Sequence, residues 1–128
     1  MTIEQTIESA CEAVPGLVNG ALALLPEGLL IGGVGTGAAF DREPLVRSAA
    51  RVLGGHVGAA LAQSASAFVE YAFVSQDQLV VIERGQTHPR VALVLVCTRE
   101  SNLALVLSTA RQALKTLEVT LDLAEWEA

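Results

Sequence analysis

Hydrophobic and polar positions alternate along this chain with two periodicities, one typical of helices and one typical of strands. Near the start, apolar side chains spaced three or four positions apart predict a helix over residues 3–14. Thr2 and Gln5 have the spacing of a capping box in front of this helix. Pro15 and Gly16 then end it.

Five segments have the residue content of strands. Residues 17–25 and 29–33 flank a Pro-Glu-Gly turn and predict a hairpin. Residues 67–75, 79–84 and 91–97 predict three further strands in an antiparallel arrangement. The last of them is apolar at every position, which indicates a central place in the sheet with both faces covered.

Two more helices are predicted, over residues 42–63 and 101–117. The helix at 42–63 has a core side formed by Leu45, Val46, Ala49, Val52, Leu53, His56, Val57 and Ala60. Its opposite side carries Arg47, Arg51, Gly54, Gly58 and Ala62, and so combines two bases with very little side-chain bulk. The helix at 101–117 has a core side formed by Leu103, Val106, Leu107, Ala110, Ala113, Leu114 and Leu117.

The glycines of the second predicted helix need an explanation. Gly54, Gly55 and Gly58 each cost about 1 kcal/mol relative to alanine, or roughly 3 kcal/mol together. Close packing of another backbone against this flat side would offset that cost. We therefore expect it to meet a second copy of the chain or a partner protein, the alternative being a surface helix with tolerated glycines.

The stretch Gly-Gly-Val-Gly-Thr-Gly-Ala-Ala begins with glycine spacing typical of a phosphate-binding loop. A P-loop continues with a lysine and then a Ser or Thr, whereas this chain has Ala38 and Ala39. The glycines also miss the spacing of the dinucleotide fingerprint. The stretch therefore predicts a loop that leads from a strand into the helix at 42–63, and we expect no cofactor.

Composition restricts the class of protein. The 128 residues suit one domain, and 52% hydrophobic against 17% charged residues suggests that apolar surface is buried against another chain. The net charge of −6 argues against nucleic acid as a partner. The acidic start does not resemble an export signal, and no segment is suited to membrane insertion. We expect a cytoplasmic protein.

Catalytic and metal-binding patterns are not visible in the sequence. Cys11 and Cys97 lack C-x-x-C spacing and are expected to be reduced thiols in the core. His56 lies on an apolar helix side, where a core histidine is the simpler interpretation, and His88 is expected to be exposed. We therefore expect neither catalytic nor metal-binding residues, and no enzyme activity of the chain's own.

The predicted order of helix, hairpin, helix, three strands and helix resembles the Roadblock family, which includes dynein light chains and bacterial regulators of Ras-like GTPases. The most specific similarities are Val-Pro-Gly at residues 14–16, Gly-Ala at 20–21 and Asn-Leu at 102–103. The resemblance covers residues 1–118 as one domain. It implies an α+β sandwich, in which a five-stranded antiparallel sheet has one long helix on one face and the two terminal helices on the other.

The resemblance also implies a homodimer. In this family the third strand is an edge that pairs with its twin, and the second helices of the two subunits lie side by side. The expected interface residues here are Gly54, Gly58, Ala62, Phe68, Val69, Tyr71 and Phe73. An apolar third strand that needs covering, and a helix side without bulk, agree with this arrangement.

The function implied by the resemblance is that of a non-enzymatic regulator or adaptor that binds a small Ras-like GTPase, which would itself hold the nucleotide. Arg47 and Arg51 are candidates for partner contact. One alternative is a structural light chain or scaffold without nucleotide-state sensing, and another is a small-molecule sensor. Residues 119–128 form an acidic tail with Trp126, which is either frayed or a docking peptide.

Overall fold

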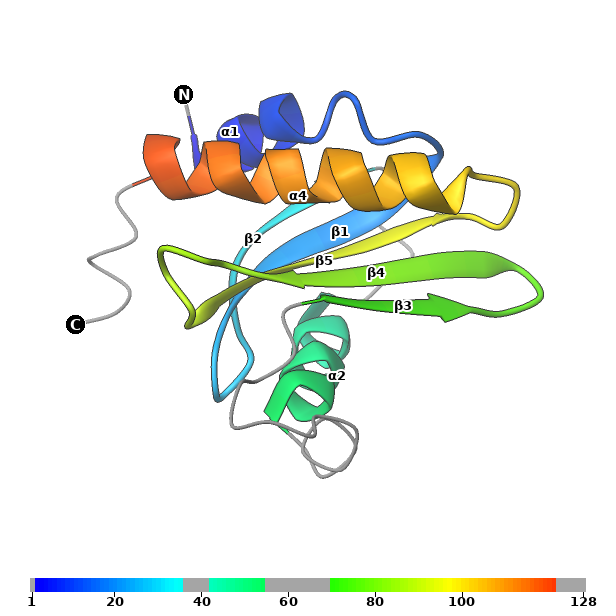
Figure 1. Ribbon diagram of the computed structural model, residues 1–128. Coiled ribbons are helices and arrows are strands. Elements are labelled where there is room, and N and C mark those ends of the chain that lie inside the picture. The colour runs from blue at the N-terminus through cyan, green and yellow to red at the C-terminus, as the bar shows by residue number, and fades with distance from the viewer. Residues whose placement is uncertain (1, 36–41, 55–69, 122–128) are drawn as a thin grey trace.

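A computed structural model of the protein describes residues 2–35, 42–54 and 70–121. Figure 1 shows their arrangement, and the order of elements matches the predicted one. The elements are α1 (Ile3–Ala10), β1 (Leu17–Leu24), β2 (Leu29–Gly35), α2 (Arg42–Gly54), β3 (Glu70–Val74), β4 (Gln78–Arg84), β5 (Val91–Thr98) and α4 (Leu103–Thr120).

The five strands form one antiparallel sheet in the order β2-β1-β5-β4-β3. β5 lies in the centre, between β1 and β4, as its uniformly apolar sequence predicted. All of its residues from Val91 to Cys97 are buried, because both faces of this strand are covered. β3 is an edge strand, in agreement with the prediction, and among the described strands it pairs with β4 alone.

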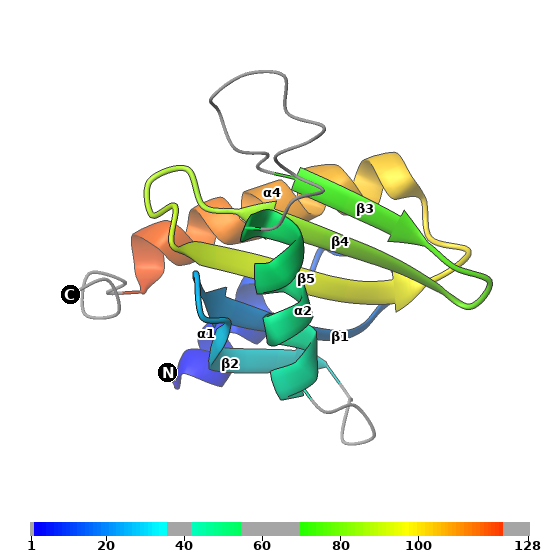
Figure 2. The ribbon, with the colours of Figure 1, turned by 90° about the horizontal axis from the view of Figure 1, so that it is seen from below.

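The helices form layers on both faces of the sheet. α1 and α4 cover one face and α2 crosses the other, which Figures 1 and 2 show from two directions. This confirms the predicted fold class, an α+β sandwich with two terminal helices on one face and one helix on the other. Among the residues that the structure describes, no helix is both long and apolar enough to cross a membrane.

Side-chain size differs between the two faces because neighbouring residues of a strand point to opposite sides. In β1, Leu22 and Leu24 face α1 and α4, whereas Ala21 and Ala23 face α2. Small side chains on the α2 side let that helix lie close to the sheet.

The first helix begins as predicted and ends earlier. The Thr2 side chain accepts a hydrogen bond from the Gln5 backbone N–H at 3.1 Å, and the Gln5 side chain accepts one from the Thr2 N–H at 2.9 Å. The helix was expected to reach residue 14 but ends at Ala10. Val14 still enters the core, since the chain continues in hydrogen-bonded turns in which its N–H donates to the Cys11 carbonyl.

The last helix is longer than expected and its buried stripe is shorter. Asn102 caps its start by accepting from the Leu105 N–H, and the helix continues to Thr120 rather than ending at residue 117. Leu103 was expected on the core side but is 40% exposed. It is the first residue of the helix, and the buried stripe begins one turn later at Val106.

The glycine-rich stretch was predicted as a loop, and this prediction is wrong for its first part. β2 continues through Gly35, while residues 36–41 lie outside the described part of the chain. A Cβ atom on Gly32 would lie 2.8 Å from Cδ1 of Ile7, and one on Gly33 would collide with the Arg42 side chain. These two glycines are therefore explained by the close approach of α1 and Arg42 to β2.

Candidate interaction surface

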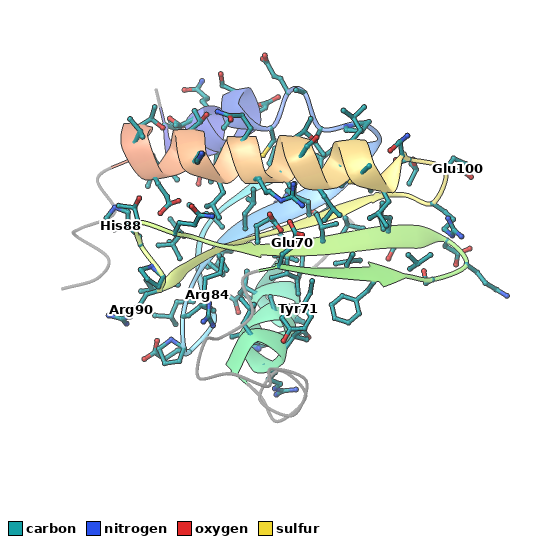
Figure 3. The ribbon with its side chains drawn as sticks, in the orientation of Figure 1. Glu70, Tyr71, Arg84, His88, Arg90 and Glu100 are labelled. Atoms are coloured by element: carbon teal, nitrogen blue, oxygen red, sulfur yellow. The ribbon has the colours of Figure 1, made fainter. Side chains whose placement is uncertain are left out.

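The edge strand β3 presents aromatic side chains on the α2 side of the sheet. Tyr71 and Phe73 are two residues apart, so they share this side, and their rings stack with centroids 6.1 Å apart. Tyr71 packs against the core under α2, whereas Phe73 is 44% exposed and the next residue, Val74, is 54% exposed. Figure 3 shows Tyr71 on the α2 side of the sheet and its neighbour Glu70 on the opposite side.

An apolar groove lies between this edge and α2. It has a volume of about 230 Å³. The side chains that line it are almost all hydrophobic: Leu45, Ser48, Ala49, Val52, Phe73, Val80, Ile82 and Val94. We refer to these residues as the apolar groove. Exposed apolar surface beside an unpaired strand edge is typical of a surface that contacts another protein.

Of the predicted flat side of α2, the structure describes Arg47, Arg51 and Gly54. Arg47, Arg51 and Gly54 are all exposed, and a Cβ atom added to Gly54 would meet no described residue within 4 Å. Along the described part of α2, open space beside the glycine leaves room for the approach of another backbone.

A basic hollow of about 480 Å³ lies next to this side of α2. Its lining residues are Leu25, Pro26, Glu27, Arg47, Ala50, Arg51, Gly54 and Arg84. Sequence reasoning missed Arg84, although the alternation of β4 places it on the α2 side with Val80 and Ile82. Figure 3 shows its side chain directed to that side of the sheet. The structure thus brings a third arginine to the two that the sequence singled out.

Arg84 also connects the sheet to the described end of α2. Its Nη2 group donates to the Leu53 carbonyl oxygen at 3.4 Å, and its Nε–H is buried without a hydrogen-bond acceptor among the described residues. A buried donor without an acceptor costs about 1–3 kcal/mol.

Arg42 sets the position of α2 at its other end, and this role was also not visible in the sequence. Its Nε–H donates to Oδ1 of the fully buried Asn19 at 3.0 Å. Its Nη2 group donates to the carbonyl oxygens of Val34 and Gly35 at 3.2 and 3.3 Å. One side chain thereby joins the start of α2 to both strands of the hairpin.

Several residues of the expected interface lie outside the described part of the chain. These are Gly58, Ala62, Phe68 and Val69, together with the predicted core histidine His56. The remaining candidates, Gly54, Tyr71 and Phe73, all lie on the α2 side of the sheet, and Phe73 and Gly54 line the apolar groove and the basic hollow, respectively.

The chemistry of the described residues gives no sign of a reactive centre. Cys11 and Cys97 are buried and form no disulfide, as predicted. Burial raises the pKa of Cys11 to about 12, with Cys97 contributing, and the pKa of Cys97 to about 11, so both are thiols rather than nucleophilic thiolates. Within residues 2–35, 42–54 and 70–121, no three His, Cys, Asp or Glu side chains are grouped for a metal ion. His88 was expected to be exposed but is half-buried beside α4, where its backbone N–H donates a hydrogen bond to the Glu118 side chain.

No protein-family model matches the chain, and a comparison with curated proteins finds no significant sequence match. Solved structures do match. A Roadblock/LC7 domain from Streptomyces avermitilis superimposes with a TM-score of 0.74 at 14% sequence identity, over 93% of this chain and 97% of that one. MglB from Myxococcus xanthus gives a TM-score of 0.74 at 20% identity, over 91% and 90% of the two chains.

The gliding protein MglB from Thermus thermophilus gives a TM-score of 0.71 at 18% identity, over 88% of this chain and 83% of that one. These matches extend over nearly the whole length of each chain, whereas the identities are too low to carry over individual residues. The resemblance inferred from the sequence is confirmed at the level of the fold. This chain has the fold of the Roadblock/LC7 domains.

Proposed function

We propose that this protein is a non-enzymatic, homodimeric regulator or adaptor that binds a small Ras-like GTPase in the cytoplasm. The observation that carries the proposal is the combination of a Roadblock/LC7 fold with a face that the described residues leave uncovered, formed by edge strand β3, the apolar groove and the outer side of α2. The resemblance of the fold to the Roadblock family suggests a small Ras-like GTPase as the partner. The uncovered face supplies the surface for assembly.

Dimerisation through this face is supported by three features of the described residues. β3 has an unpaired edge, Phe73 is exposed beside the apolar groove, and Gly54 leaves open space on α2. A second copy placed across β3 would continue the sheet and would bring its own α2 alongside the first. One similar structure is of MglB in a tetrameric arrangement, which supports assembly as a property that this fold allows.

The basic hollow supports an acidic contact surface on the partner. Arg47, Arg51 and Arg84 gather around it with a single acidic residue, Glu27, although the whole chain has a net charge of −6. Glu27 lies 3.8 Å from Nη2 of Arg90 in an exposed ion pair. The hollow therefore carries local positive charge that favours carboxylates of a partner.

Nucleotide-dependent capture tests the proposal. Tagged protein is incubated with native lysate in the presence of a non-hydrolysable GTP analogue or of GDP, and the bound proteins are identified by mass spectrometry. A regulator binds one nucleotide state of the GTPase more tightly than the other, since a ligand shifts an equilibrium only through differential affinity. We expect a Ras-like GTPase in only one of the two samples.

The recovered GTPase then serves to test the basic hollow. The double substitution Arg47→Ala and Arg51→Ala is expected to weaken GTPase binding about tenfold or more while leaving self-association unchanged, because it removes two cations without adding bulk to the side of α2 that a second copy would approach. Arg99→Ala, an exposed base in the turn between β5 and α4, is the matched control and should bind as the wild type does. Equal recovery of partners with both nucleotides would instead support the scaffold alternative.

A further inference from the structure

Two carboxyl groups face each other across the outermost pair of strands. Glu70 on β3 is directly opposite Glu83 on β4, on the face covered by α4. The side chain of Glu83 is only 5% exposed, while that of Glu70 is 27% exposed. Like charges directly opposite one another destabilise a strand pair, so this position requires a compensating group.

Arg111 on α4 supplies that compensation unequally. Its Nε–H donates to Oε1 of Glu70 at 2.6 Å and its Nη2 group to Oε2 at 3.0 Å, which forms a bidentate pair. The nearest oxygen of Glu83 lies 3.8 Å from Arg111 Nε. One guanidinium group therefore lies near two carboxyl groups, and both of its short hydrogen bonds go to Glu70.

Because Arg111 neutralises mainly Glu70, one proton shared by the two carboxyl groups removes the second negative charge. Burial, a hydrogen bond with Glu70 and the charge of Glu70 together raise the pKa of Glu83 to about 8, against the opposing effect of Arg111. The hydrogen bond from Arg111 lowers the pKa of Glu70. Among the described residues, no amide, hydroxyl or cationic group donates to Oε2 of Glu83. At neutral pH, Glu83 is therefore the acid and Glu70 the carboxylate.

The other charged groups around this cavity of about 230 Å³ do not replace the proton. Glu118 on α4 accepts hydrogen bonds from the backbone N–H groups of Thr87 and His88. Arg84 is engaged with the Leu53 carbonyl on the other side of the sheet. Lys115 is exposed to solvent, where its charge is screened.

The remaining strand neighbour also offers no compensation. On β5, the residue opposite Glu83 is the buried and apolar Leu93. A second negative charge at Glu83 would therefore be poorly solvated and close to Glu70.

We propose that Glu70, Glu83 and Arg111 form a proton-sensitive latch. While the two carboxyl groups share one proton, the latch holds edge strand β3 against β4 and α4. When that proton is lost, β3 is held less tightly. The geometry favours β3 as the element that yields, because it is the edge strand and β4 is held between two neighbours. The latch is a property of the single chain and does not depend on the proposed GTPase or dimer. If β3 is the dimer edge, the latch also makes that edge sensitive to pH.

The sign of the effect follows from the raised pKa. Glu83 is protonated in the folded protein below about pH 8, whereas in the unfolded chain it ionises near its ordinary value of 4.5. The contribution of protonated Glu83 to the free energy of unfolding is fully present below pH 4.5. It is lost progressively as the pH rises to about 8. Within the folded protein, the latch opens as Glu83 ionises around pH 8.

Hydrogen exchange of the β3 and β4 amides, corrected for the intrinsic effect of pH, measures the latch directly. In the wild type we expect protection of the hydrogen-bonded β3 amides to fall about tenfold or more between pH 6.5 and pH 9, with little change in β1 and β5; tenfold corresponds to one pKa unit of coupling. The carboxyl carbon signal of Glu83 should titrate over the same range. Glu83→Gln keeps the shape and cannot ionise, so its β3 protection should not vary with pH.

Glu118→Gln is the matched control, since it removes a carboxylate of the same cavity whose partners are backbone N–H groups. It should retain the wild-type dependence on pH. The proposal is overturned if Glu83 titrates while β3 protection stays constant, or if Glu83→Gln retains the pH-dependent loss. Titration of Glu83 near its ordinary pKa in the wild type would also overturn it, without any need for a variant.

Discussion

The two faces of the sheet are covered to very different degrees. On one face, α1 and α4 pack large side chains such as Leu22, Leu93 and Leu117 into a continuous buried core. On the other face, the described part of α2 covers alanines and leaves Phe73 exposed beside an open groove. Figure 2 shows α2 crossing the sheet while β3 lies at its margin.

Under the proposed function, this difference separates the face that the chain fills with its own helices from the face that a second copy would cover. A face filled by its own helices stabilises the fold, and changes there should alter the free energy of unfolding. If the proposed dimer forms, the face with the edge strand and the exposed aromatic surface would gain burial on association. Substitutions on the two faces should therefore have different consequences.

The largest effect is expected on the covered face. Leu93→Ala removes a fully buried side chain of the central strand and should lower the free energy of unfolding by about 2–5 kcal/mol. Urea denaturation followed by circular dichroism measures this change. A loss below about 1 kcal/mol would mean that the core around β5 is much less tightly packed than the structure shows.

Phe73→Ser should act mainly on assembly. We expect it to weaken self-association about 10–100-fold, because it removes an aromatic side chain at the centre of the proposed interface. The free energy of unfolding of the monomer should fall by less than for Leu93→Ala, since Phe73 is 44% exposed and loses mainly its stacking on Tyr71. Val119→Ser is the control, as Val119 is 86% exposed on α4, and it should leave self-association unchanged in sedimentation velocity.

The smallest effect on stability is expected at Gly54. Gly54→Ala should stabilise the monomer by about 0.4–1 kcal/mol, since a Cβ atom meets nothing there and the φ angle is not positive. Gly54→Leu adds a bulky side chain at the same position, and it should weaken self-association by filling the space that a second α2 would occupy. The two variants compared by thermal unfolding and sedimentation separate these effects. Unchanged association of the Leu variant would remove Gly54 from the interface.

Local patterns were sufficient to predict the order of elements. The apolar run of β5 required two covered faces, and the cap at Thr2 marks a helix start through side-chain hydrogen bonds within three residues. The ends of elements were less predictable. α4 continues past residue 117 because Glu118 receives donors from the loop at residues 86–88, which is a contact between distant parts of the chain.

The polar clusters could not be found from local spacing alone. Glu70, Glu83 and Arg111 lie on three different elements, and the register that places the two carboxyl groups opposite each other is a property of the folded sheet. The alternation of β4 does place Glu83 on the same face as Leu79 and Val81, which was an available sign of its burial. Arg84 was hidden for a similar reason, because its reach across to Leu53 depends on where α2 lies.

Sedimentation equilibrium of the wild-type protein tests most directly the claim that the α2 face is completed by a second copy. The chain has a mass of 13.4 kDa, and we expect a species of twice that mass at micromolar concentration, which Phe73→Ser converts towards the monomer. A wild-type protein that remains at 13.4 kDa over the whole concentration range would contradict it.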